Sequence, residues 1–242
     1  MSDTQTALET LIQSPFARLN ALLADIPPGA DPILFSLGEP YTALPPFVQP
    51  VLQEYVAAFG KYPPIRGIPE LREAICSWLA RRYPALTDVV DPERHVLPLN
   101  GSREGLFSAI FPAIARKPAI PNPSVLIPNP FYQVYAAAAA AAGTEPVFLR
   151  SGADTGFLPD LDSLDSALLG RTVALYMCSP SNPEGAVATH AYLEKAIRLA
   201  RAHDFLLFAD ECYSEIYGNT PPAGALEVAQ ARSCTPVSYT HL

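Results

Sequence analysis

From about residue 95 onward, short apolar runs alternate with segments of helical periodicity, and this alternation is the feature that most restricts the fold. The apolar runs are His95–Leu99, Ser124–Ile127, Pro146–Leu149, Thr172–Cys178 and Phe205–Ala209, and the helical segments span 103–116, 131–142 and 190–203. Almost continuously apolar runs are typical of strands that are covered on both faces. Because strands joined by helices form βαβ units, we predict an α/β fold with a mostly parallel sheet and helices on both faces.

The N-terminal third carries weaker signals. Residues 1–24 have helical apolar spacing that ends at Pro27-Pro28-Gly29, and a short extended piece is predicted at Ile33–Leu37. Pro69 is expected to open an amphipathic helix. Proline accounts for 27 of the 242 residues, roughly twice its average usage, which argues against an all-helical bundle.

Composition argues against several classes of protein. The net charge of −8 and the lack of a basic run make nucleic acid and anionic membranes poor partners. No apolar run reaches the roughly 18 residues of a membrane-spanning helix, and the first residues do not resemble a secretory signal. The cysteines have no CxxC spacing and the histidines no metal-ligand spacing. We expect reduced thiols in a cytoplasmic protein and no metal site, with a disulfide or metal set as the alternative.

Ligands of open α/β sheets bind beyond the carboxyl ends of the strands, so the residues after each predicted strand are candidates. Asn100-Gly101-Ser102-Arg103 starts a helix, where free backbone N–H groups suit a phosphate, with Ser102 as the cap. An ordinary capped helix is the alternative. Asp210 follows a buried apolar strand and needs a partner, such as a cationic ring nitrogen, an arginine or a metal. A helix cap or a solvent-facing carboxylate is the other interpretation.

Three more side chains follow predicted strands. Tyr132 offers a ring that stacks on a flat ligand or packs in the core, and Asn182 is a ligand-binding amide or an ordinary turn residue. The Tyr213 hydroxyl lies three residues after Asp210 and is within reach of the same pocket. Together these groups suit a ligand with a phosphate, an aromatic ring and a basic ring nitrogen. Pyridoxal 5'-phosphate (PLP) has these parts, whereas no strand is followed by the GxGxxG of a dinucleotide site.

Six segments resemble the class I and II, fold-type I aminotransferases, which use PLP. The resemblance runs from about residue 14 to 228 and is carried by Phe35–Pro40, Lys61–Ile75, Asn100–Glu104, Asn129–Tyr135, Ser179–Ala186 and Ala209–Tyr217. Within the family, the sequence looks most like succinyldiaminopimelate aminotransferases of bacterial lysine biosynthesis. The resemblance implies a homodimer with a PLP-binding large domain at 46–228, here truncated. Residues 1–45 would belong to the family's small domain.

The resemblance also implies roles for single residues in cofactor binding. The backbone at Ser102 and Arg103 would hold the cofactor phosphate, and Tyr132 would stack on the pyridine ring. Asn182 and the Tyr213 hydroxyl would hydrogen-bond the oxygen on that ring.

Four other positions concern charge, substrate and the dimer. Asp210 would pair with the protonated ring nitrogen and keep the ring an electron sink. Gly38 would lie at the substrate carboxylate, and Tyr62 would reach the cofactor phosphate of a partner subunit. Glu184 stands where the family usually has the threonine of Asn-Pro-Thr-Gly, and we expect its side chain to face solvent.

The lysine that forms the Schiff base in this family has no counterpart here. The three lysines of the chain are Lys61, Lys117 and Lys195, and none follows Asp210, where the family places that residue. We therefore assign no catalytic residue and expect these 242 residues alone to be inactive. Residues 233–242 resemble translated sequencing-adaptor sequence, so we expect a non-native tail without strand or helix. The strand at Phe205–Ala209 would then lack a neighbour.

Three functions stay open at this point. The first is an aminotransferase that moves an amino group between glutamate and a keto acid, such as the succinylated precursor of diaminopimelate. The second is another PLP reaction on the same fold, a carbon–sulfur lyase or an acyl-transferring synthase, because these enzymes share their cofactor contacts. The third is a non-catalytic aminotransferase-like sensor module, although residues 1–24 contain no helix-turn-helix pattern or basic face.

Overall fold

The computed structural model describes residues 15–31, 33, 38, 42–230 and 238–240. The chain divides into two compact units between Ile68 and Pro69. The predicted domain boundary between residues 45 and 46 stays a prediction. No helix in the described part of the chain is both long enough and apolar enough to cross a membrane.

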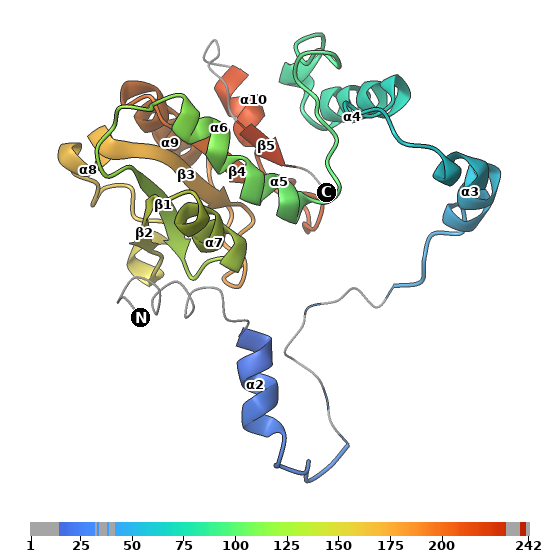
Figure 1. The fold of residues 1–242 in the computed structure, drawn as a ribbon, viewed down its shortest axis with the longest axis horizontal. Coiled ribbons are helices and arrows are strands. Elements are labelled where there is room, and N and C mark those ends of the chain that lie inside the picture. The colour runs from blue at the N-terminus through green and yellow to red at the C-terminus, as the bar shows by residue number, and fades with distance from the viewer. Residues whose placement is uncertain (1–14, 32, 34–37, 39–41, 231–237, 241–242) are drawn as a thin grey trace. The chain divides into compact units, whose positions relative to one another are not determined.

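The unit that begins at Pro69 contains a parallel sheet with the strand order β2-β1-β3-β4-β5 (Figure 1). The strands are β1 (Ser124–Asn129), β2 (Glu145–Arg150), β3 (Thr172–Cys178), β4 (Leu206–Asp210) and β5 (Ser238–Thr240). Each neighbouring pair is parallel. The predicted α/β fold with a parallel sheet is therefore confirmed.

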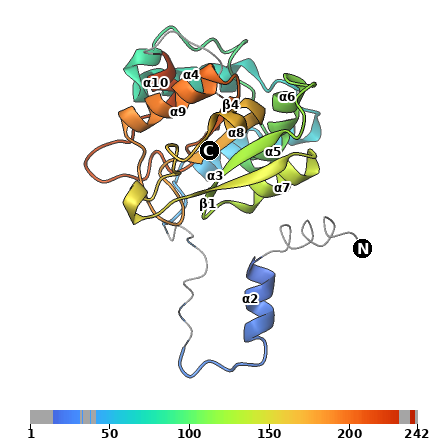
Figure 2. The same ribbon diagram turned by 90° about the vertical axis from the view of Figure 1, so that its left-hand side faces the viewer.

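Helices cover both faces of this sheet, and the alternation of side chains along each strand decides which residue meets which layer. One layer consists of α5 (Ser102–Ser108), α6 (Ile110–Ala115) and α7 (Gln133–Ala141), and the other of α8 (Ser166–Arg171), α9 (His190–Ala202) and α10 (Ala225–Gln230). In β1, Val125 and Ile127 pack with the first layer and Leu126 with the second. Figure 2 shows the two helical layers on either side of the strands. Because β1 is buried on both faces, its sequence is apolar without alternation.

A smaller cluster of side chains lies beside the sheet. The helix predicted to open at Pro69 is confirmed as α4 (Pro69–Arg82), and the 3-10 helix η2 (Pro84–Leu86) follows it. Leu79 and Leu86, from these two helices, pack with Leu226 of α10. A further 3-10 turn, η3 (Ala153–Thr155), follows β2. The segment after Pro69 therefore belongs to the same packed unit as the sheet.

Two predicted elements were wrong. His95–Leu99 is not a strand: the segment starts from a turn in which the His95 N–H donates to the Asp91 carbonyl, and the residues after it are irregular. The single helix predicted at 103–116 is two helices that meet at Ala109. Pro112 has no N–H for the carbonyl four residues before it, which weakens a continuous helix at this point.

The expectation that β4 lacks a neighbour was also wrong. β5 lies within the segment 233–242, for which no strand was expected, and it pairs in parallel with β4 from Phe208 to Asp210. An open strand edge presents unpaired N–H and C=O groups that any extended segment can satisfy. The non-native origin of 233–242 stays a prediction.

The unit Ile12–Ile68 contains α2 (Pro15–Leu23), α3 (Val48–Glu54) and the 3-10 helix η1 (Val56–Gly60). α2 confirms the predicted helix within the described part of residues 1–24. Neither α3 nor η1 contains a buried residue. The predicted extended piece falls on residues 33–37, of which 34–37 lie outside the described residues.

Candidate active site

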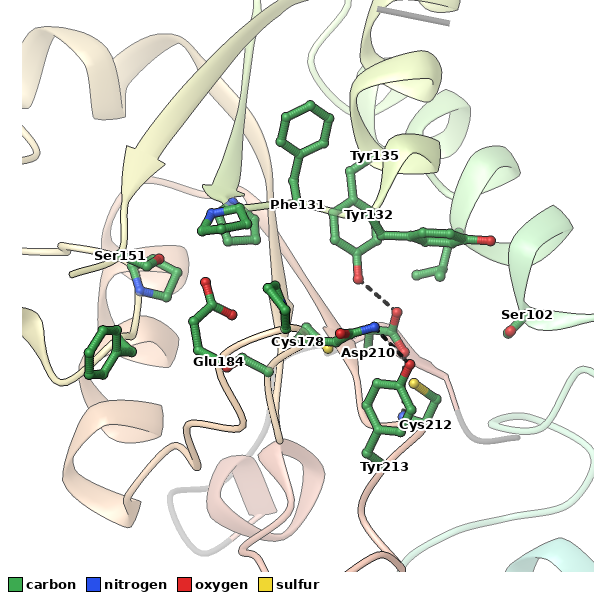
Figure 3. A pocket seen from close by; sticks show the side chains of 18 residues that line it. Ser102, Phe131, Tyr132, Tyr135, Ser151, Cys178, Glu184, Asp210, Cys212 and Tyr213 are labelled. Atoms are coloured by element: carbon green, nitrogen blue, oxygen red, sulfur yellow. Dashed lines mark hydrogen bonds between the residues drawn. The ribbon is translucent and has the colours of Figure 1, made fainter. Parts of the chain in front are cut away.

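A pocket of about 390 Å³ opens where β1, β3 and β4 end. Because these strands are parallel, their carboxyl ends lie on one edge of the sheet, and the loops after them supply the lining. Five of the predicted site residues line this pocket together: Ser102, Tyr132, Asn182, Asp210 and Tyr213. All of them except Asn182 are labelled in Figure 3. Arg103 does not line the pocket and instead contacts the hydroxyl of Tyr132.

Asp210 is the buried charged group of this pocket, with 5% of its surface exposed. The Tyr135 hydroxyl donates a hydrogen bond of 2.7 Å to its Oδ2 atom (Figure 3), and the Cys212 N–H lies 3.4 Å from Oδ1. Both donors are neutral, so they orient the carboxylate without cancelling its charge. Asp210 is therefore able to pair with a cationic group of a ligand, as the sequence predicts.

Tyr135 is a site residue that the sequence reasoning missed. Its ring stacks on Tyr176 with centroids 4.5 Å apart and meets Tyr132 edge-on at 5.8 Å. Burial and the negative charge of Asp210 raise the pKa of the Tyr135 hydroxyl, so the group stays protonated and donates. The sequence does contain a signal for this role, a tyrosine within an alanine-rich helix. A buried hydroxyl needs a hydrogen-bond partner, so such a tyrosine is expected to point toward a polar group.

Tyr132 presents its ring to the pocket and is held at its outer end. The Arg103 Nε atom donates to the Tyr132 hydroxyl at 2.8 Å, and the guanidinium lies 5.9 Å from the ring centroid. This hydrogen bond raises the pKa of Arg103. The side chain of Arg103 thus orients Tyr132, which is a contact that the sequence did not predict.

The predicted phosphate site lies at the start of α5. Ser102 is the first residue of this helix and not its N-cap, so the predicted cap was wrong. Gly101 takes the N-cap position with φ of 116°, a conformation that favours glycine and provides no side-chain cap. The first N–H groups of the helix therefore lack a side-chain acceptor at the cap, and phosphate binding there stays a prediction.

Asn182 and Tyr213 come from different loops and meet in the pocket. The Asn182 Nδ2 atom donates to the Tyr213 hydroxyl at 3.1 Å. Burial raises the pKa of Tyr213, so its hydroxyl keeps its proton at neutral pH. An amide and a phenol at this distance are suited to share one ligand oxygen.

Glu184 lines the same pocket, and the expectation that it faces solvent was wrong. Its Oε1 atom is buried and has no hydrogen-bond partner among the described residues.

The cysteines nearby, Cys178 and Cys212, are free thiols, as is Cys76. Cys234 lies outside the described residues.

No lysine lines the pocket in the part of the chain that the structure describes. Lys117 donates from Nζ to the carbonyls of Thr172, at 3.2 Å, and His203, at 2.7 Å, and Thr172 begins β3 at the end away from the pocket. Lys195 forms an ion pair with Asp162. Neither of these lysines is in position to reach a ligand beside Asp210.

The other predicted positions lie in the unit Ile12–Ile68. Gly38, Lys61 and Tyr62 are exposed there. The substrate contact of Gly38 and the dimer contact of Tyr62 stay predictions.

Comparison with known proteins identifies the family of the chain. Residues 30–239 match the family model of class I and II aminotransferases. The chain belongs to this family. LL-diaminopimelate aminotransferases from Desulforudis audaxviator and Nitratidesulfovibrio vulgaris are 34% and 32% identical over 90% and 97% of the chain.

Solved structures agree on the aminotransferase fold. An aminotransferase from Neisseria meningitidis has a TM-score of 0.83 at 34% identity, with 96% of this chain and 58% of that chain covered. A Thermus thermophilus aspartate aminotransferase variant has a TM-score of 0.71 at 30% identity and covers 95% of this chain and 55% of its own. The chain spans 54% and 60% of the lengths of the two diaminopimelate relatives.

Aminotransferases of this family use PLP, and the described pocket fits that group. A buried carboxylate, which has no cationic partner among the described residues, lies at a strand end and suits a protonated ring nitrogen. A half-exposed aromatic ring, Tyr132, borders the pocket, and Asn182 and the Tyr213 hydroxyl meet in it. The start of α5 has no side-chain cap. The cofactor predicted from the sequence is thus the one that the family uses.

Proposed function

We propose that this protein is an aminotransferase that uses PLP to move an amino group between glutamate and a keto acid. The observation that carries the proposal is the Tyr135–Asp210 pair, a buried carboxylate that lines the pocket and is oriented by neutral donors. Family membership supports the reaction class.

Each residue of the pocket would have a separate role in binding PLP. Asp210 would hold the proton on the ring nitrogen, and Tyr132 would fix the plane of the ring by stacking. Asn182 and Tyr213 would bind the ring oxygen, and the backbone at Ser102 would bind the phosphate. When bound, PLP withdraws electrons from the amino-acid Cα and makes its proton acidic. Asp210 would sustain that effect by keeping the ring nitrogen protonated.

The proposed substrates belong to diaminopimelate and lysine biosynthesis. The relatives named LL-diaminopimelate aminotransferase support an unmodified keto-acid precursor of diaminopimelate. The segment resemblance supports the succinylated precursor. We also propose a cytoplasmic homodimer, to which Tyr62 would contribute a phosphate contact across the interface.

An amino-donor screen on the protein encoded by the complete gene tests the proposal. Glutamate-dependent conversion of a keto acid, with 2-oxoglutarate as the co-product, is the expected result. Assays with the succinylated and unmodified precursors then identify the acceptor. Release of pyruvate and ammonia from cystathionine, without amino transfer from glutamate, would instead establish the carbon–sulfur lyase.

A further inference from the structure

The pocket carries two carboxylates, and only one of them has a described partner. Asp210 accepts from Tyr135, whereas the buried Oε1 atom of Glu184 has no hydrogen-bond partner among the described residues. No lysine, arginine or histidine is found among the described lining residues. A pocket of this charge favours a ligand with two cationic groups.

A hydrogen-bonded turn fixes the backbone that carries Glu184. The Ser181 N–H donates to the Ala186 carbonyl at 2.8 Å, and the Gly185 N–H donates to the Ser181 carbonyl at 2.9 Å. The Ala186 N–H also donates to Ser181 Oγ at 3.0 Å. Gly185 has φ of 71°, which a residue with a side chain rarely adopts. The turn therefore presents Glu184 and Asn182 to the pocket from one rigid loop.

Glu184 lies in a different part of the pocket from the predicted phosphate site. Figure 3 shows its carboxylate between Ser151 and Cys178, with Asp210 between it and Ser102. A group bound at Glu184 is thus remote from a group bound at Ser102. The second carboxylate is placed to contact a different part of the bound molecules.

A buried carboxylate oxygen without a donor is unfavourable, and a ligand N–H group removes that penalty. An ammonium group does so best, because it supplies both positive charge and several donors. The threonine that the family usually has at this position is neutral and offers no such attraction. Having glutamate at position 184 in place of the usual threonine therefore affects which substrates bind.

We propose that Glu184 binds a second ammonium group of the substrate, distinct from the amino group that is transferred. This inference rests on the proposed aminotransferase function and narrows the substrate that exchanges its amino group with glutamate. The amino-acid form of that substrate would carry a second, free amine, as in the unmodified and not the succinylated precursor. Glu184 would be a specificity-determining residue among the substrates that exchange with glutamate, because one without the second amine would leave the carboxylate unpaired.

Matched amino-acid probes test this inference on the PLP-loaded protein from the complete gene. α-Methyllysine and α-methylnorleucine differ only in the terminal ammonium, and neither has a Cα proton to lose, so calorimetry measures their Kd without turnover. We expect the wild type to bind the lysine analogue at least tenfold more tightly. Glu184→Gln should bring the two Kd values together by weakening the lysine analogue alone.

Two further variants make the result decisive. Glu184→Thr should give the same loss of discrimination as Glu184→Gln, which excludes a folding defect of one variant. Glu73→Gln removes an exposed carboxylate from α4 and should leave the Kd ratio unchanged. A wild-type ratio near one, or a ratio that Glu184→Gln does not alter, overturns the role of Glu184. Amino transfer from glutamate, measured separately on the wild type, tells this failure from failure of the proposed function.

Discussion

Replacing Tyr135 by Phe isolates the hydrogen bond that holds Asp210. The change removes one hydroxyl and leaves the ring, so the stacking on Tyr176 at 4.5 Å remains. Among the described residues, Asp210 keeps the Cys212 N–H at 3.4 Å, which is a long contact, and the neutral Cys212 thiol. Hydrogen bonds to charged groups contribute about 1.5–3 kcal/mol, and Asp210 is buried, so we expect the free energy of unfolding to fall by about 2 kcal/mol.

Urea denaturation of the cofactor-free protein measures this loss. With a slope of roughly 2 kcal/mol per molar urea, the midpoint should fall by about 1 M. Tyr213→Phe is the matched control, because the described partners of its hydroxyl, Asn182 and the Cys212 thiol, are neutral. That variant should lose no more than about 1 kcal/mol. If Tyr135→Phe costs no more than Tyr213→Phe, the carboxylate does not depend on the Tyr135 hydroxyl and the reasoning fails.

Four other experiments test the pocket residues, the start of α5 and the lysines. Asp210→Asn should cut kcat roughly 30- to 5,000-fold, because removing one partner of a buried charged pair costs about 2–5 kcal/mol; near-normal turnover would remove Asp210 from the mechanism. Tyr132→Ala should raise the Kd for PLP more than it lowers kcat, and an unchanged Kd would contradict the stacking role. Gly101→Ala should destabilise the protein by about 1–2 kcal/mol in urea, because φ of 116° disfavours a side chain, and a neutral result would show that the α5 start relaxes. PLP followed by borohydride should label no lysine stoichiometrically in these 242 residues, because Lys117 is bound to two carbonyls; mass spectrometry that finds one fully labelled lysine, with turnover, would contradict this.

The sheet could be predicted from the sequence because its central strands are covered on both faces. Thr172–Cys178 was predicted with the bounds that β3 has, since an unbroken apolar run between turns leaves little choice. Parallel strands then bring their carboxyl ends to one edge, which is why the residues after them line one pocket. The same reasoning failed at His95–Leu99, where apolar residues occur without a partner strand and Leu97 stays 60% exposed.

Side-chain directions were the part that sequence reasoning could not supply. Tyr135 belongs to an apolar helix, and only the packing of α7 on the sheet aims its hydroxyl at Asp210. Glu184 lies in a turn rich in polar residues, where a charged side chain ordinarily faces water. Its side chain is half-buried, and its Oε1 atom is buried. The closed turn between Ser181 and Ala186 that carries it depends on backbone angles that the sequence suggests only through Gly185.

Charged groups are distributed unevenly along the pocket. Its described lining has carboxylates and no cationic side chain, so attraction for a phosphate rests on the backbone N–H groups at Ser102 and on the nearby Arg103. Arg103 keeps its charge, because its hydrogen bond to Tyr132 raises its pKa. Glu184 lies on the far side of Asp210 from Ser102, where it repels the phosphate least (Figure 3). The described charges therefore favour a bound assembly whose anionic group lies at Ser102 and whose cationic groups lie at Asp210 and Glu184.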